Sequence, residues 1–353
     1  MSTTHDKLLT DFRAGRKAAL ARAISIVENH RAGFEQVLGA LHPLTGRARR
    51  VGITGPPGAG KSTLTTLLAR LYRGKGLTVG IVAVDPTSPF TGGALLGDRI
   101  RMEEVALDPG VYIRSLATRG SLGGLSAATR EACDVMDAFG VDRILIETVG
   151  VGQSELEVAR TADTSLVVLV PESGDSIQTL KAGLMEIADV FTVNKADRPG
   201  ADRLRNEIEI MLGMRGGAAL RNVPAHHGVD LKRSNIARQA RAASMEESDT
   251  WTPPVLSTVA AKGEGIEVLS DALDRHFGYL ERSGTLRTRR RARLRDRVVE
   301  AVEDKARRRL WNDDPTNAWL EERLPELESG VLTPFAVADL LLARSADLLT
   351  RTS

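Results

Sequence analysis

The sequence predicts an α/β fold in which a mostly parallel sheet carries helices on both faces, with helical segments before and after it. From Arg50 onward, apolar runs of strand length alternate with amphipathic helical segments, a pattern typical of such a sheet. A glycine-rich loop follows the first strand and precedes a helix-forming segment at residues 64–70. Other polar motifs also follow strands. Because ligands bind at the carboxyl ends of parallel strands, we expect the functional site at that edge.

The composition is that of an ordinary globular protein. Of the 353 residues, 42% are hydrophobic and 27% are charged, and the length suits two domains or one domain with helical additions. The net charge of +2 argues against nucleic acid as the main partner. The single cysteine, Cys133, cannot form an internal disulfide, which fits a reducing compartment. No apolar run approaches the length of a membrane span and no signal sequence is recognised, so we expect a cytoplasmic protein without membrane contact.

The strands and helices divide the chain into three predicted parts. Residues 1–48 form an N-terminal helical segment, with a helical apolar period over residues 8–41, and residues 282–353 form a C-terminal helical arm. Residues 49–281 form the domain between them. Its predicted strands are 51–54, 79–84, 111–115, 144–146, 166–170, 190–193 and 255–259. Its predicted helices are 62–72, 124–139, 154–162, 202–211 and 266–280.

The C-terminal arm has more apolar surface than two helices bury by themselves. Leu294, Val298 and Val302 step by four along a strongly charged helix. A second helix begins at Thr333, an N-cap followed by a proline at the first helical position. This apolar surface is expected to pack either against a second subunit or against the arm's own domain, and the sequence does not decide between the two. The arginines of residues 287–295 predict a solvated helix face rather than an RNA site, because no aromatic residues stand among them.

The loop at residues 55–63 fits the phosphate-binding pattern G-x-x-x-x-G-K-[ST]. Gly58 and Gly60 allow successive backbone N–H groups to turn toward phosphate oxygens, and the helix dipole adds to the attraction. Lys61 supplies a charge between the β- and γ-phosphates, and Ser62 supplies a hydroxyl for Mg²⁺. The alternative is a glycine-rich turn without a ligand. The nucleotide-binding candidates of this loop are Gly55, Pro56, Pro57, Gly58, Ala59, Gly60, Lys61, Ser62 and Thr63.

A second motif predicts which base is bound. Asn194, Lys195, Ala196 and Asp197 follow strand 190–193 in the pattern N-K-x-D. An aspartate carboxylate accepts two hydrogen bonds from the N1–H and 2-amino groups of guanine, a pair of donors that adenine lacks. A site built around Asp197 therefore favours GTP over ATP.

Acidic residues at strand ends are candidate magnesium ligands. Glu147 reaches the metal directly or through water, and the backbone N–H of Gly150 meets the γ-phosphate. Asp85, at the end of the second strand, and Asp98 are further candidates. Their alternative roles are helix caps and turns.

No Ser/His/Asp or Cys/His set predicts covalent catalysis. Hydrolysis would depend on positioning a water molecule and neutralising charge with Lys61 and Mg²⁺, with Asp98 and Glu147 as the other catalytic candidates. Gln153, Glu155 and Asp98 are all possible residues for orienting the water. Residues 221–254 are polar and irregular, and the neighbouring His226 and His227 without further ligands do not predict a metal site.

The motifs together resemble a known family. The segments GPPGAGKST, VDPTSPFTGGALLGDRIRM, ILIETVGVGQSE and FTVNKADRPG, in this order, are similar to those of the MeaB/ArgK GTPases, which include the methylmalonic aciduria type A protein. The resemblance covers residues 6–205 and resumes from residue 252. It implies a homodimeric P-loop GTPase that escorts an adenosylcobalamin-dependent acyl-CoA mutase, usually methylmalonyl-CoA mutase.

The resemblance also implies roles for individual residues. Asp85, Asp98 and Glu147 would serve Mg²⁺ and the nucleotide, and the regions 85–103, 147–163 and 170–181 match the family's switches. The loop of Val259, Ala260 and Ala261 would contact guanine, but Val259 stands where the family carries a serine. A backbone contact survives this change, whereas a serine side-chain contact does not. The alternatives are a metal-insertion GTPase, whose Cys/His clusters are absent here, and a protein kinase linked to amino-acid transport.

Overall fold

The computed structural model describes residues 3–85, 102–117, 122–148, 158, 160–171, 185–215 and 250–345. Seven strands form one sheet in the order β3-β2-β4-β1-β5-β6-β7, and all neighbouring strands are parallel. This confirms the predicted fold class. The strands are β1 (Arg49–Thr54), β2 (Val79–Asp85), β3 (Val111–Ala117), β4 (Arg143–Thr148), β5 (Thr164–Leu169), β6 (Val190–Val193) and β7 (Val255–Ser257).

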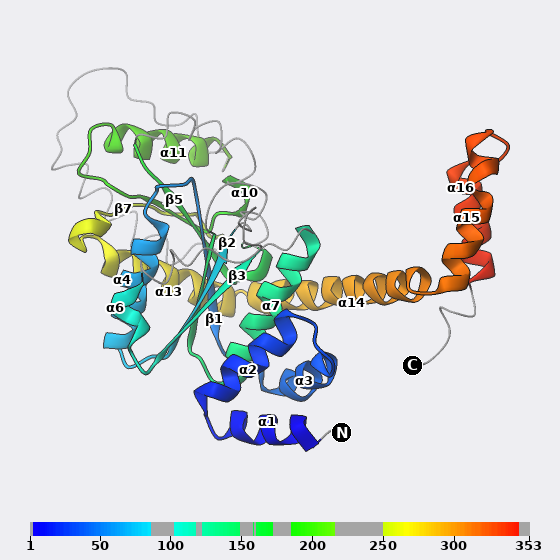
Figure 1. Cartoon of the computed structure of the whole chain (residues 1–353). Coiled ribbons are helices and arrows are strands. Elements are labelled where there is room, and N and C mark those ends of the chain that lie inside the picture. Colours follow the sequence, from blue (N-terminus) through cyan, green and yellow to red (C-terminus); the bar gives the residue numbers. More distant parts are fainter. Residues whose placement is uncertain are drawn as a thin grey trace. The chain divides into compact units, whose positions relative to one another are not determined.

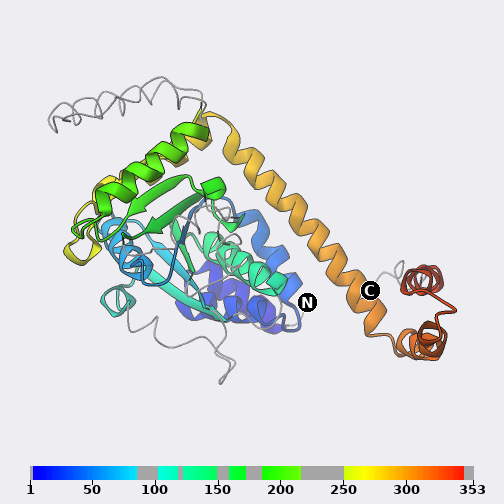
Figure 2. The same cartoon turned by 90° about the horizontal axis from the view of Figure 1, so that it is seen from above.

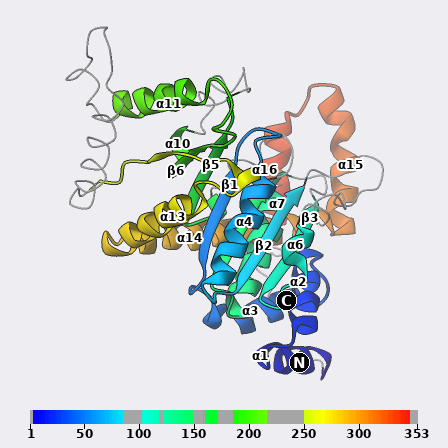
Figure 3. The ribbon, with the colours of Figure 1, turned by 90° about the vertical axis from the view of Figure 1, so that its left-hand side faces the viewer.

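Helices cover both faces of the sheet, as Figures 1 and 3 show. One face packs against α4 (Lys61–Gly74), α6 (Glu103–Ala106) and α13 (Ile266–Arg282). The other packs against α7 (Leu122–Ala138) and, over β5 to β7, against α11 (Ala201–Arg215). Because successive strand residues point to opposite faces, Ile81 belongs to the first apolar layer and Val82 to the second. Strands buried on both sides are continuously apolar, which is why the sequence revealed them.

The N-terminal segment forms three helices where the sequence predicted one continuous helical region. They are α1 (Thr3–Arg13), α2 (Lys17–Glu28) and α3 (Phe34–Leu41). Gly15, between α1 and α2, and Gly33, the N-cap of α3, have left-handed φ values of +72° and +87°, so the chain cannot continue as one helix through them. Phe12 and Val27 pack in the same apolar cluster as Cys133 of α7, which is fully buried. The described residues also include three short helices, η1 (His42–Leu44), which follows α3, α10 (Met185–Ile187) and η4 (Ala260–Lys262).

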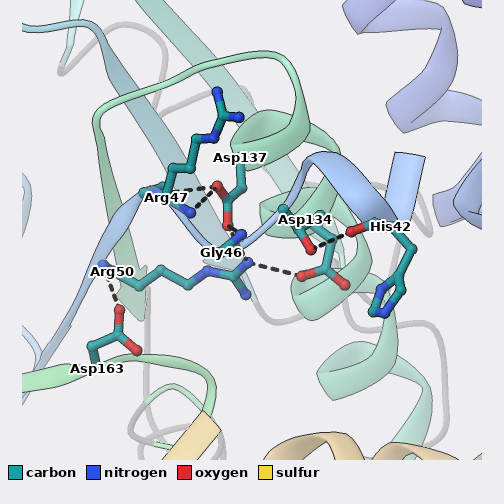
Figure 4. Close-up of polar contacts among 9 residues, drawn as sticks. His42, Gly46, Arg47, Arg50, Asp134, Asp137 and Asp163 are labelled. Atoms are coloured by element: carbon teal, nitrogen blue, oxygen red, sulfur yellow. Dashed lines mark hydrogen bonds and ion pairs between the residues drawn. The ribbon is translucent and has the colours of Figure 1, made fainter. Parts of the chain in front are cut away.

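A buried carboxylate fixes the start of β1. Asp137 on α7 accepts hydrogen bonds from the backbone N–H groups of Gly46, Arg47 and Ala48, at 2.8, 3.0 and 2.9 Å (Figure 4). The Arg50 guanidinium donates to Asp134 at 2.8 Å and to Asp137 at 3.1 Å. Burial opposes the positive charge of Arg50, but the carboxylates of Asp134 and Asp137 outweigh it and raise the pKa of Arg50.

The start of β1 is therefore held at the edge of the sheet opposite the predicted ligand edge. A further hydrogen bond joins the Arg50 N–H to Asp163, which precedes β5, at 3.2 Å. These bonds fix where β1 enters the sheet and so where its carboxyl end delivers the glycine-rich loop.

The chain divides into two compact units, Met1–Leu286 and Arg287–Ser353. The boundaries that the sequence suggested at residues 48 and 281 remain predictions. The second unit consists mainly of α14 (Thr285–Trp311), an uninterrupted helix (Figure 2), with α15 (Asp314–Glu328) and α16 (Pro334–Arg344). The predicted N-cap of α16 is confirmed, because Thr333 Oγ1 accepts from the N–H of Ala336 at 3.2 Å. Among the described residues, no helix is both long and apolar enough to cross a bilayer.

Candidate functional site

The phosphate loop connects β1 to α4, as the sequence predicted. Gly58 and Gly60 have φ values of +74° and +89°, and Gly55 has a φ of +138°. A Cβ at Gly55 would lie 2.0 Å from the carbonyl oxygen of Val168, and one at Gly60 would lie 2.4 Å from Asn194 Nδ2. Glycine is therefore required at 55 and 60 by close approach as well as by backbone conformation.

The Lys61 ammonium lies inside the loop. Lys61 is the first residue of α4 and is buried, and its Nζ donates to the carbonyl oxygens of Gly55 and Pro56 at 2.7 and 3.1 Å. A cation is thus placed at the N-terminus of a 14-residue helix, where backbone N–H groups also point outward. This combination of charge and donors fits the phosphates of a nucleotide.

A hydroxyl and a carboxylate meet beside the loop. Ser62 Oγ donates a hydrogen bond to Oε1 of Glu147, a buried residue of β4. The register of the parallel pair places Glu147 opposite Ile53 of β1, just before the strand leads into the loop. Side-chain oxygens are the ligands that Mg²⁺ prefers, so this pair fits a magnesium ion bound together with nucleotide phosphates.

The other predicted magnesium and phosphate residues are located less completely. Asp85 ends β2, and the β2–β4 register pairs Val84 with Thr148, so the backbone of Asp85 lies at the same edge of the sheet. Asp98 and Gly150 lie outside the described residues, as do the two candidates for orienting water, Gln153 and Glu155.

The N-K-x-D motif follows β6 and is tied to the phosphate loop through Asn194. The buried Asn194 side chain donates from Nδ2 to the carbonyl oxygen of Ala59 at 2.8 Å. Its Oδ1 accepts from the N–H of Ala260 at 3.0 Å and from Thr258 Oγ1 at 3.2 Å. One amide therefore joins the phosphate loop to the loop after β7. The sequence identified Asn194 and Ala260 as site residues, but it contained no signal for Thr258.

The predicted base-reading residue lies at the surface beside a lysine that the sequence analysis did not select. Asp197 Oδ2 is 3.2 Å from Lys262 Nζ, and both side chains are about half exposed, at 42% and 56%. Lys195 adopts a left-handed φ of +55°. In the loop after β7, Val259 and Ala260 are buried, whereas Ala261 is exposed. This loop replaces the end of the predicted strand 255–259, because Val259 forms an antiparallel bridge with Glu264 and β7 ends at Ser257.

Comparison with known proteins identifies the family. Residues 20–314 match the family model described as methylmalonyl Co-A mutase-associated GTPase MeaB. The chain belongs to the MeaB GTPase family. A putative GTPase of Pyrococcus horikoshii is 43% identical to this MeaB-family chain over 339 residues, covering 96% of this chain and 98% of the relative.

Two further relatives carry more specific names. GTPase ArgK of Escherichia coli is 33% identical and covers 91% of both chains. The mitochondrial methylmalonic aciduria type A homolog of Mus musculus is 32% identical over 358 residues, covering 96% of this chain and 78% of the mouse protein. The solved structure of a protein named LAO/AO transport system kinase superposes with a TM-score of 0.61 at 27% identity and covers 97% of each chain.

Membership of the MeaB family establishes the activity that the motifs predicted. The protein binds guanine nucleotides and hydrolyses GTP, as its relatives named GTPases and its P-loop fold indicate. The described residues contain no group of three or more His, Cys, Asp or Glu side chains that could hold a metal ion. The Ser62–Glu147 pair suits an ion that retains water and phosphate ligands.

Proposed function

We propose that this GTPase is a chaperone of an adenosylcobalamin-dependent acyl-CoA mutase, with methylmalonyl-CoA mutase as its partner. The family match over residues 20–314 carries this proposal, because the family is described as associated with that mutase. The full-length similarity to a methylmalonic aciduria type A homolog supports the same partner. In this role, GTP hydrolysis controls cofactor loading and protects the mutase from inactivation.

The proposed nucleotide site combines three parts of the sheet edge. The backbone of residues 55–63 and the Lys61 ammonium hold the phosphates, while Ser62 and Glu147, with Asp85 and Asp98, serve Mg²⁺. Gly150 contacts the γ-phosphate through its N–H. Asn194 and the loop 259–261 support the base, and Asp197 reads it. No covalent intermediate is involved: the Lys61 ammonium neutralises the charge that develops as water attacks the γ-phosphate, and a magnesium ion held by Ser62 and Glu147 would supply further positive charge there.

The second unit is proposed to pair two copies of the chain into a homodimer. Leu294, Val298 and Val302 are 48, 63 and 61% exposed on α14, and Phe335 on α16 is 84% exposed. Exposed apolar residues that repeat along one helix are typical of an interaction surface. Sedimentation equilibrium on the full chain measures this directly, and a monomer at micromolar concentration contradicts the pairing.

Affinity capture tests the mutase proposal. The full chain is immobilised and incubated with purified methylmalonyl-CoA mutase in the presence of GDP or a non-hydrolysable GTP analogue. We expect a complex whose amount depends on the nucleotide, together with faster GTP hydrolysis when the mutase is present. If the same amount of mutase is retained with both nucleotides and GTP hydrolysis is unchanged, the chaperone proposal is contradicted. The GTPase activity is not affected by that result.

A second candidate function follows from the similarity to the protein named LAO/AO transport system kinase. Its test is transfer of the labelled γ-phosphate from GTP or ATP to protein in a cell extract. Release of inorganic phosphate alone supports hydrolysis.

The third candidate function is that of a metal-insertion GTPase. Metal analysis of the purified protein distinguishes it from the other two, since bound nickel or cobalt is expected only for a metal-insertion GTPase.

A further inference from the structure

The Asp197 carboxylate, which is proposed to read guanine, is partly exposed to solvent although it must hold one orientation to bind the base. The backbone around Asp197 is well held, since the N–H of Ala196 donates to the carbonyl oxygen of Thr258 at 3.0 Å and Arg198 N–H donates to Lys195 at 3.0 Å. The Asp197 side chain, however, is 42% exposed. Two parallel hydrogen bonds to the base require both carboxylate oxygens in one orientation, so the side chain needs a partner that limits its rotation.

Lys262 provides such a partner, with its Nζ 3.2 Å from Asp197 Oδ2. The backbone of Lys262 is fixed by a tight turn: its N–H donates to Val259 at 2.9 Å, and the N–H of Gly263 donates to Ala260 at 3.1 Å. Val259 and Glu264 exchange hydrogen bonds at 3.1 and 3.2 Å, which close the turn. The lysine is therefore presented toward Asp197 by a rigid loop rather than by a mobile one.

The residue that begins this turn cannot perform the same task. Val259 is buried and has no side-chain donor, so it contributes only backbone groups. The turn ends in close contact with β7, because a Cβ at Gly265 would lie 2.5 Å from the carbonyl oxygen of Ser257. Within the described part of the chain, Lys262 is the cation that pairs with the Asp197 carboxylate.

We propose that Lys262 is a positioning residue for guanine recognition, which holds the Asp197 carboxylate through an ion pair in a loop where Val259 offers no hydroxyl. The inference rests on the proposed nucleotide site. An ionised carboxylate has about four acceptor positions on its two oxygens, so one contact to Lys262 leaves enough for the N1–H and 2-amino groups of guanine. The lysine thereby fixes the carboxylate without competing with the base.

The test compares GDP with inosine diphosphate, which has the same N1–H and 6-oxo groups but lacks the 2-amino group. Dissociation constants are measured by equilibrium competition against a fluorescent nucleotide for the full chain, Lys262→Met and Lys262→Arg. An exposed ion pair changes affinity modestly. We expect Lys262→Met to raise the Kd for GDP about three- to tenfold, which corresponds to about 0.7–1.4 kcal/mol. The Kd for inosine diphosphate should rise less, and Lys262→Arg should retain most of the discrimination.

A double-mutant cycle shows whether the lysine acts through the carboxylate. In an Asp197→Ala background, Lys262→Met should change the Kd for GDP less than twofold. Lys75→Met, an exposed lysine that follows the C-terminus of α4, is the matched control and should leave both affinities unchanged.

Several results overturn the proposal. An equal rise for both nucleotides, or the same effect with and without Asp197, means that Lys262 contacts the nucleotide directly. A lower Kd for GDP in Lys262→Met means that the lysine competes with guanine, and no change in any Kd means that the ion pair has no role. Failure of the unaltered chain to bind GDP at all would instead refute the proposed nucleotide site.

Discussion

The bridging amide of Asn194 allows a quantitative test of how the site is assembled. The substitution Asn194→Ala removes three hydrogen bonds, of 2.8, 3.0 and 3.2 Å, to Ala59, Ala260 and Thr258. Each hydrogen bond contributes about 1 kcal/mol net to stability, and buried partners left without one add to the loss. We therefore expect the free energy of unfolding to fall by about 3 kcal/mol.

Urea unfolding of the nucleotide-free full chain, followed by far-UV circular dichroism, measures this loss. The m-value must stay unchanged if the substitution acts on the folded state. Asn206→Ala on α11 is the control, because Asn206 is an exposed asparagine. Its effect should stay within about 0.5 kcal/mol. A loss below about 1 kcal/mol for Asn194→Ala would show that the two loops are not joined through this side chain.

Two further predictions concern catalysis and pH. Lys61→Ala should reduce GTP hydrolysis more than about 100-fold in a phosphate-release assay, because the charge at the start of α4 is lost; near-normal turnover would refute its assigned role. Burial raises the pKa of Tyr72 to about 12 in the folded protein, so the unfolded state loses this proton at lower pH. The contribution of Tyr72 to the free energy of unfolding should therefore be fully present below about pH 10 and be lost between pH 10 and 12. In urea titrations, the free energy of unfolding of Tyr72→Phe should decrease by up to about 2–3 kcal/mol less than that of the unaltered chain over this pH range. The same pH dependence in both proteins would contradict the raised pKa of Tyr72.

The sequence alone determined the sheet, because strands buried on both faces are apolar throughout. The strand at 190–193 was predicted with its observed bounds, and the helix after the phosphate loop within two residues at each end. Where the prediction was wrong, local signals were weak or conflicting. Residues 282–353 were predicted as a helical arm, but α15 was not recognised as a separate helix. Its interior Pro325 disfavours a helix, whereas its N-cap Asp313, which accepts from the N–H of Thr316 at 3.0 Å, is a residue type that favours a helix start.

The motifs likewise determined the identity of the phosphate loop and of the guanine-reading tetrapeptide, since each depends on residues that are close in the chain. The tertiary structure alone decided how these parts are joined. Asn194 and Ala59 are 135 positions apart, Ser62 and Glu147 are 85 apart, and Lys262 meets Asp197 across the β6–β7 edge. Such contacts depend on the order and register of parallel strands, which a local pattern of residues does not specify.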